Sequence, residues 1–439
     1  MRKQNTISYK KDNIIISLYV IIFLLIPIIS FPVTRNVPSE YATIQSAINA
    51  SADGDEIIVA QGTYKENINF NGKNIILRST DPTSSTVVAA TIIDGNQKES
   101  VVTFSGTESI ECVLEGFTIT NGKAIYGGGI NGNWNIALIQ NNIIIGNSCP
   151  FDGGGLFGCN GIIQNNTIAG NSADFGGGLS NCNGFIVNCI IWNNSDHSYP
   201  QIYLSSTPIY SCIQDWTGGG VGNIKDDPKF VDPVNNNFHL QPDSPCIDKG
   251  NLFYVIGENI RDIDGECRLA GISVDMGCDE YGSYKDTDGD LLSDVEEVNK
   301  GTNPDKSDTD EDGLIDGIEV LRGTNPVIKD TLTGISVPAK YPSIQRAIFM
   351  AFAGEKITVS TRSYKENLYF GGKNIILQSL NPDDKNIVQN TIIDGSKIHS
   401  VITFKGSENA ICSISGFTIC NGKGHYGGGI NVMVMVLIL

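Results

Sequence analysis

Four short segments recur between residues 117 and 195: FTITNG (117–122), NIIIGNS (142–148), NTIAGNS (166–172) and CIIWNNS (189–195). Their superposition places one isoleucine of each segment in a single column at nearly even intervals: Ile119, Ile144, Ile168 and Ile191. Each segment is a β-branched run bounded by Asn, Ser and Gly, and none is long enough for a helix. One such unit cannot bury its apolar face alone, so the pattern predicts that successive units stack.

Glycine and asparagine follow the same period. Glycine triplets begin at Gly127, Gly153 and Gly176, and a column of asparagines contains Asn141, Asn165 and Asn188. Glycine permits positive φ at corners, and stacked asparagines can hydrogen-bond along the axis at turns. A leucine-rich repeat would need Leu-x-x-Leu-x-Leu and often a helical arc, whereas here Ile replaces Leu and glycine takes the place of a helix. The sequence therefore predicts a mainly β fold, a right-handed parallel β-helix in which each repeat unit forms one turn.

Cysteines share this period, since Cys182 follows Cys159, and Cys212 follows Cys189, by the same interval as one repeat unit. Stacked rungs would bring Cys159 and Cys182 about one strand spacing (~4.8 Å) apart. Disulfide geometry between in-register parallel rungs is demanding, so we expect stacked small apolar side chains rather than bridges. With eleven cysteines, at least one thiol is left unpaired.

A longer repeat duplicates the first part of the chain, because Val37–Asn131 aligns without a gap on Val337–Asn431. The open end of a solenoid must be covered. Residues 41–51 place Ile44, Ala47 and Ile48 at helical spacing, which predicts an amphipathic capping helix, and the second copy repeats it. After Asn431 the sequence becomes continuously apolar, which predicts a truncated second β-helix with an uncapped edge.

Several stretches resemble a known family. TIQSAINASADGDEIIVAQGTYKENI (43–68) and GFTITNGKAIYGGGI (116–130) resemble the bacterial exported right-handed β-helix proteins of the pectin-lyase-like superfamily. Residues 227–250 and 261–282 are similar to the segment that closes the helix in many of those proteins. The resemblance implies a fold but no activity, because this fold carries lyases, hydrolases, esterases, adhesins and phage spikes.

The N-terminus has basic residues followed by an apolar run from Ile14 to Ile29, which is typical of a signal-peptide core and short for a membrane span. We expect export, with a signal peptide or an uncleaved anchor at 1–32. The remaining expected divisions are a first β-helix with its capping helix and closing segment at 33–283, an acidic connector at 284–330, and the truncated second β-helix at 331–439. The expected location is secreted or at the cell surface.

The chain is acidic, with 48 Asp and Glu against 30 Lys and Arg and a net charge of −18. Such a surface repels phosphate backbones and anionic lipid, which argues against nucleic-acid binding and limits membrane contact to the N-terminal segment. Half of that charge lies in the connector, where residues 285–330 contain 14 acidic and 5 basic residues.

The connector is itself a tandem repeat of acidic positions. The first repeat has Asp286, Asp288, Asp290, Asp294 and Glu297, and the second has Asp308, Asp310, Asp312, Asp316 and Glu319. Alternating carboxylates in a tight loop, completed by a later Asp and Glu, suit Ca²⁺, which is coordinated by several oxygen ligands. The spacing resembles an EF-hand-type loop and, more closely, the thrombospondin type 3-like repeats of bacterial surface proteins. These ten residues are the predicted calcium ligands, although a solvated acidic linker would have the same composition.

The two loops differ at one position, because Gly313 follows Asp312 whereas Leu291 follows Asp290. In the family that the repeats resemble, this position is glycine. The second loop therefore matches the family pattern fully, and the first departs from it in a way that affects its expected geometry and calcium affinity.

Signals for catalysis are weak. Lys123 is the only basic residue between Gly116 and Ser195, although a polysaccharide lyase needs a base. Asp152 and Asp174 precede glycine triplets of successive rungs, close to Lys123 and Tyr126, and two carboxylates could form a glycosidase pair. Asp beside Gly is also ordinary turn chemistry. The sequence favours a protein that binds an extracellular or cell-surface glycan or protein, with a carbohydrate-active enzyme acting on acidic polysaccharide as the alternative.

Overall fold

The computed structural model describes residues 32–82, 84–195, 201–251, 262–263, 268, 273–282, 286–330, 334–397, 400–404, 408, 411–423 and 427–432. The expected signal peptide or anchor at 1–32 lies outside the described residues except for its last position, and so does most of the apolar C-terminal tail. Among the residues that are described, no helix is both long enough and apolar enough to cross a membrane.

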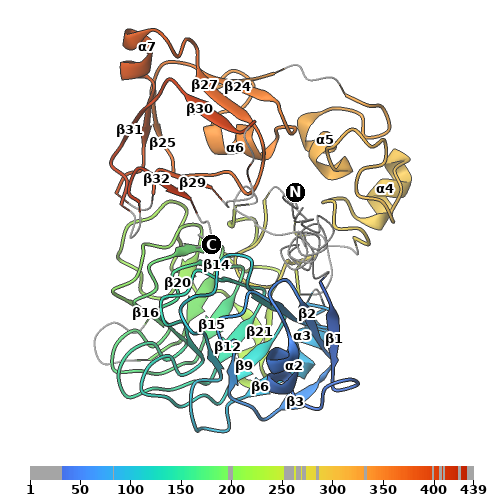
Figure 1. Ribbon diagram of the computed structural model, residues 1–439, viewed down its shortest axis with the longest axis vertical. Coiled ribbons are helices and arrows are strands. Elements are labelled where there is room, and N and C mark those ends of the chain that lie inside the picture. The colour runs from blue at the N-terminus through green and yellow to red at the C-terminus, as the bar shows by residue number, and fades with distance from the viewer. Residues whose placement is uncertain are drawn as a thin grey trace, which may run out of the picture.

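Three all-parallel sheets form the first part of the chain (blue to green in Figure 1). Sheet A contains β1 (Thr34–Val37), β2 (Glu56–Val59), β5 (Ile76–Ser79), β8 (Val113–Glu115), β11 (Leu138–Gln140), β14 (Ile162–Gln164) and β17 (Phe185–Val187). Sheet B contains β3 (Gly62–Tyr64), β6 (Thr91–Asp94), β9 (Thr118–Thr120), β12 (Ile143–Ile145), β15 (Thr167–Ala169), β18 (Ile190–Trp192) and β20 (Cys212–Ile213). Sheet C contains β4 (Ile68–Asn69), β7 (Val102–Thr103), β10 (Ile130–Asn131), β13 (Leu156–Phe157), β16 (Leu179–Ser180) and β19 (Ile202–Tyr203).

From β2 to β19 the chain visits sheets A, B and C in turn, so every third strand joins the same sheet. The predicted isoleucine column is confirmed. Ile144 pairs with Ile119 on one side and with Ile168 on the other, and Ile168 pairs with Ile191. All four side chains are fully buried. A mainly β fold of parallel sheets wound in this order is consistent with a solenoid of the β-helix type.

The interior of the three sheets is one continuous apolar core. It contains the isoleucine column together with Phe70 and Phe104, whose ring centroids lie 4.5 Å apart. Cys159 and Cys182 are buried in the same core as free thiols. Each fully buried Ile or Phe contributes roughly 1.5–3 kcal/mol to stability, so the stacked column is a main source of the folding free energy.

Asparagines stabilise the turns in two ways. The expected column of Asn141, Asn165 and Asn188 adopts positive φ near 50°, and two of its side-chain oxygens have no hydrogen-bond partner. The prediction that these three asparagines hydrogen-bond to one another along the axis is therefore wrong. The next residue does so instead, since the Asn142 side chain donates to Asn166 Oδ1 at 3.1 Å.

A second asparagine ladder lies between sheets B and C. The side-chain amide of Asn147 donates to Asn171 Oδ1, and that of Asn171 donates to Asn194 Oδ1, both at 3.0 Å. All three residues are buried. Each side chain therefore hydrogen-bonds to polar groups of the neighbouring rungs, and these bonds fix the spacing between rungs at this corner.

Helix α2 (Ile44–Ala50) covers the first rung as predicted, with Ile44, Ala47 and Ile48 fully buried. A reciprocal capping box between Thr43 and Ser46 begins the helix, because each side chain accepts from the other residue's backbone amide. The short helix α3 (Ser85–Ala90) follows β5 and contacts sheet B.

The segment expected to close the solenoid packs on the outer face of sheet B. Strands β21 (Phe230–Asp232) and β22 (Asn237–Leu240) form an antiparallel hairpin around the 3₁₀ turn η1 (Pro233–Asn235). Phe230 and Phe238 are buried with Ile143, Ile145 and Ala169, whose side chains point away from the solenoid interior. The hairpin is thus a cover along the side of the sheet.

The second set of sheets (orange to red in Figure 1) has the same order of pairing. Its strands are β23 (Ile335–Val337), β24 (Lys356–Val359), β27 (Ile376–Ser379) and β30 (Ser413–Ser415); β25 (Ser363–Lys365), β28 (Ile392–Asp394) and β31 (Thr418–Cys420); and β26 (Leu368–Tyr369), β29 (Ile402–Phe404) and β32 (Ile430–Val432). Helix α6 (Ile344–Phe349) occupies the position of α2, and α7 (Lys385–Asn390) that of α3. The strands of each of these sheets pair in parallel.

Candidate metal centre

The two acidic loops of the connector each lead into a short helix, α4 (Asp294–Lys300) or α5 (Asp316–Arg322). Gly301 and Gly323 end these helices in the left-handed conformation, with φ near 80°. Each helix carries one glutamate back toward its own loop, and both Glu297 and Glu319 are completely buried. A buried carboxylate without a counter-charge is costly, so this placement itself points to a cation.

The first loop forms two overlapping groups of carboxylates. Asp286, Asp288 and Asp290 bring one oxygen each to within 4.8 Å of one another. Asp290 also belongs to a second group with Glu297 and with Asp316 of the following repeat. Asp316 therefore links the first loop to the second.

The second loop repeats this arrangement with a different third member. Asp308, Asp310 and Asp312 form one group, and Asp312 forms another with Glu319 and Asp330. Asp330 is absent from the predicted ligands. The signal that could have identified it is its spacing, because Asp330 follows Asp308 by the same interval as Asp308 follows Asp286 and so matches the first position of a further repeat.

The predicted ligands Asp294 and Asp316 take up equivalent positions in their repeats. Asp294 accepts hydrogen bonds from the backbone amide of Thr287 at 2.7 Å and from its hydroxyl at 2.8 Å. Asp316 accepts the same two bonds from Thr309. Both carboxylates thus hold the loop against the start of its helix. Asp316 also belongs to a carboxylate group of the first loop, whereas Asp294 belongs to none of the four groups.

Backbone amides orient the remaining carboxylates. Asp286 accepts from the amide of Gly289 at 2.7 Å, and Asp308 accepts from that of Gly313 at 2.9 Å. Other oxygens are buried and have no hydrogen-bond partner; they belong to Asp288 (both), Asp290 (Oδ2), Glu297 (Oε2), Asp310 (Oδ2) and Glu319 (both). Native proteins leave few buried polar atoms unsatisfied, so these unpaired oxygens fit a hard divalent cation of the calcium type.

Burial and mutual repulsion shift the acidities of these groups. Desolvation, with the neighbouring carboxylates adding to it, raises the pKa of Asp290, Glu297 and Glu319 to about 8 and that of Asp288 to about 6. Desolvation also raises the pKa of Asp310 and Asp316. Without a cation the ionised cages are therefore unfavourable, and a divalent ion would remove that cost.

The position that differs between the loops is left-handed in both. Gly313 has φ +100° and Leu291 has φ +80°. A left-handed leucine costs roughly 1–2 kcal/mol. Its side chain is buried in the core that also contains Leu314, Ile318 and Ile344 of helix α6, so packing offsets the strain.

The carboxylates considered for catalysis are out of register. Asp152 forms backbone bridges with Tyr126 and Phe175. The residue stacked on Asp152 in the next rung is therefore Phe175, and Asp174 precedes it in the chain. Asp152 Oδ1 accepts a hydrogen bond from Ser180 at 3.2 Å. The register gives no support to a paired carboxylate site.

One family model matches the chain, the bacterial TSP3 repeat, over residues 286–306 and 308–327. These two segments contain the acidic loops and their helices, and the parallel sheets lie outside them. No curated protein and no solved structure matches the chain. The match identifies the connector as two bacterial TSP3 repeats, a calcium-binding type of repeat that indicates an extracellular protein.

Proposed function

We propose that this chain is an exported, calcium-binding surface or extracellular protein built on a duplicated right-handed parallel β-helix of the pectin-lyase-like kind. In this proposal the signal peptide or anchor is 1–32, the first β-helix 33–283, the calcium repeats 284–330 and the second β-helix 331–439. The observation that carries the calcium assignment is the set of buried carboxylate oxygens without partners in the two acidic loops.

Calcium would be held by nine of the ten predicted carboxylates and by Asp330. The tenth, Asp294, would position the first loop through Thr287. The ion supplies charge neutralisation and fixes the loops. Calcium would stiffen the junction with the second set of sheets. Leu291 and Leu314 of the two loops and Ile318 of helix α5 share one buried core with the cap of those sheets. Calcium thereby orients the second β-helix relative to the connector.

The solenoid would bind its partner through a row of aromatic side chains beside sheet C. We call this the aromatic row; it contains Tyr126, Trp134, Phe151, Phe157, Phe175 and Tyr203. Tyr126 stacks on Phe151 and Phe157 with centroids 5.8 and 5.0 Å apart, and Phe175 stacks on Tyr203 at 5.1 Å. Tyr126 and Phe151 remain 42% and 49% exposed.

Exposed aromatic faces on a rigid strand scaffold suit the apolar faces of sugar rings, and this favours a glycan over a protein as the partner. A glycan array tests this with the Tyr126→Ala variant. Loss of glycan binding supports the aromatic row as the binding surface. Retention of all glycan signals, or capture of a protein with no glycan signal, argues against it, and cleavage of a bound polysaccharide would favour the enzyme alternative.

Isothermal titration calorimetry of Ca²⁺ into the chelator-treated full chain tests the calcium assignment. We expect binding at or below about 1 mM, weakened by about tenfold or more in Glu319→Gln. The matched control is Asp305→Asn, because Asp305 lies in the same connector and outside the four carboxylate groups. The absence of calcium binding near millimolar would refute the assignment.

A further inference from the structure

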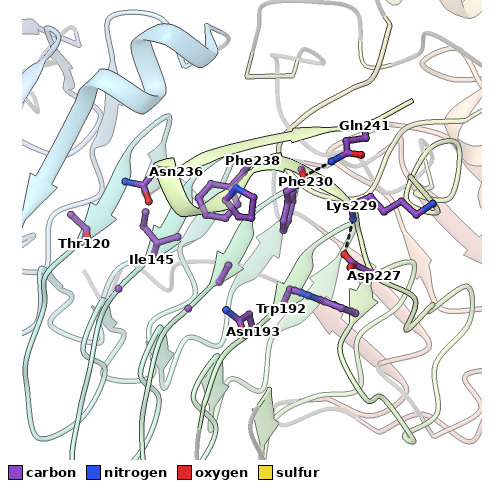
Figure 2. Close-up of a pocket in the computed structure, with 14 residues that line it drawn as sticks. Thr120, Ile145, Trp192, Asn193, Asp227, Lys229, Phe230, Asn236, Phe238 and Gln241 are labelled. Carbon is purple, nitrogen blue, oxygen red and sulfur yellow. Dashed lines mark hydrogen bonds between the residues drawn. The ribbon is translucent and has the colours of Figure 1, made fainter. Parts of the chain in front are cut away.

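A pocket of about 550 Å³ lies between the outer face of sheet B and the β21–β22 hairpin (Figure 2). Strands β12, β15 and β18 contribute its floor, and the hairpin lies over it. It is separate from the acidic loops and from the aromatic row, which lies beside sheet C. Its volume is within the range of small-molecule sites, ~300–1,000 Å³.

The floor is hollowed by two glycines. The residue after each of the four successive strands β9, β12, β15 and β18 adopts a left-handed conformation; these residues are Asn121, Gly146, Gly170 and Asn193. The two middle rungs therefore lack the side chain that the outer two carry. A Cβ atom added to Gly170 would meet nothing within 4 Å, so this position opens into empty space.

The walls are aromatic and held in place by packing. Phe230 and Phe238 are buried, with their rings edge to face at a centroid distance of 5.0 Å. Trp192 is half-buried at the end of β18 and lines the pocket from the sheet side. These rings give the pocket a rigid apolar surface onto which a flat, apolar molecular face can pack.

The rim is polar and uses groups that both donate and accept. Within the part of the chain that is described, the side-chain amides of Asn193 and Asn236 make no hydrogen bond, and both line the pocket. Asp227 accepts from the backbone amide of Lys229 through Oδ1, and Gln241 donates to the Phe230 carbonyl at 2.8 Å. Amides and a carboxylate match a ligand that carries several hydroxyl groups.

The charge of the pocket disfavours an acidic ligand. Among the described residues that line the pocket, the basic one is Lys229. It already forms an ion pair with Asp243, with Nζ 2.5 Å from Oδ2. Asp227 adds a carboxylate at the rim, and the whole chain carries −18. A carboxylated or phosphorylated ligand would meet net repulsion here.

We propose that this pocket binds one neutral hexose or N-acetylhexosamine unit of a glycan. The apolar face of the sugar ring packs on Trp192 over the hollow at Gly146 and Gly170, while its hydroxyls bond to Asn193, Asn236 and Asp227. The inference goes beyond the proposed function, because it places a second, separate sugar site on a different sheet and specifies the charge of its ligand.

The test is a glycan array carrying neutral hexoses, N-acetylhexosamines and, as counter-probes, uronic acids. The decisive variant is Gly170→Asn, since asparagine occupies the same backbone conformation at positions 121 and 193 and its side chain would fill the pocket. The matched control is Gly54→Asn, another left-handed glycine with nothing within 4 Å, which lies in the turn after α2. Thermal unfolding monitored by circular dichroism verifies that both variants fold.

We expect the wild type to bind neutral sugars and not uronic acids, Gly170→Asn to lower the affinity by about tenfold or more, and Gly54→Asn to match the wild type. Trp192→Ala should reproduce the loss if Gly170→Asn does not fold. The inference is overturned if no neutral sugar binds, if uronic acids bind better, or if both pocket variants bind as the wild type does. Binding that is lost in Tyr126→Ala but kept in Gly170→Asn would overturn it too, since the glycan would then belong to the aromatic row alone, with the proposed function left standing.

Discussion

Arg322 and Glu355 form an ion pair in which Nη1 lies 3.0 Å from Oε2, with side chains only 2% and 0% exposed. Arg322 is the last residue of helix α5, and Glu355 lies in the turn between α6 and β24. The Arg322 guanidinium also donates to the Met350 carbonyl and lies over the Phe352 ring. A buried ion pair, in addition to apolar packing, thus joins the second acidic repeat to the cap of the second set of sheets.

Removing Glu355 should strongly destabilise this junction. Glu355→Ala leaves a buried arginine without its partner, and breaking such a pair costs about 3–5 kcal/mol. Chemical denaturation with calcium present measures the change in the free energy of unfolding. The comparison variant is Glu311→Gln, which breaks the exposed pair with Lys306 and should change stability little. Equal effects of the two variants would contradict a structural role for the buried pair.

Calcium should raise the stability of the same junction. An ion that binds only the folded loops stabilises them by about 2.7 kcal/mol at a hundredfold excess over its dissociation constant. Differential scanning calorimetry of the full chain should therefore show a transition that moves up with Ca²⁺ and down with chelator. Glu319→Gln should reduce that shift and Asp305→Asn should preserve it. If the unfolding transition of the wild type did not respond to calcium, ion binding in the loops would not contribute to the stability of the junction.

Calcium affinity should depend on pH. The pKa values of Asp290, Glu297 and Glu319 near 8 lie above those of the unfolded chain, so without calcium these groups destabilise the fold as pH rises from about 4 through 8. Calcium must displace the protons, so its affinity should rise from pH 6 to pH 8 with proton release. Calorimetry in two buffers of different ionisation enthalpy measures both. A constant affinity with no proton release would show that the ions bind elsewhere.

The sequence was sufficient to predict the rung register and the capping helix, because both depend on local spacing of apolar residues. Ile144 can face only inward when Ile143 and Ile145 face outward. The ladder residue was misassigned because Asn141 and Asn142 are chemically identical neighbours, and only the backbone conformation distinguishes the turn residue from the one that bonds to the next rung.

The contacts between distant segments could not be predicted from the sequence. Phe230 and Phe238 could pack against any apolar surface of the protein. Their local sequence therefore does not indicate that they cover sheet B and leave a pocket there. Tyr369 shares a buried cluster with Ile110, Leu138 and Ile162 from the first part of the chain, a contact that depends on how the connector folds. Asp330 was missed because the rest of its repeat is absent from the sequence that follows it.

The buried asparagine ladder should be essential for stability. Asn171→Ala removes the acceptor for the Asn147 amide and the donor to the Ile144 carbonyl, and both groups stay buried. Each unsatisfied group costs about 1–3 kcal/mol, so the expected loss is about 2–5 kcal/mol. Denaturant unfolding measures it against Asn49→Ala, an exposed asparagine of α2. A loss no greater than that of the control would show that water replaces the side chain.

The left-handed Leu291 gives the sharpest test of how the first calcium loop differs from the second. Leu291→Gly should relieve about 1–2 kcal/mol of backbone strain but remove a buried side chain worth about 2–5 kcal/mol, so the net effect should be destabilising. The reverse change, Gly313→Leu, adds a Cβ that meets nothing within 4 Å at φ +100° and should cost only the strain. Denaturant unfolding of both variants, with calcium titration alongside, measures these terms separately. If Leu291→Gly instead stabilised the chain, the backbone strain at Leu291 would exceed the benefit of burying its side chain. The junction with the second set of sheets would then depend mainly on the Arg322–Glu355 ion pair.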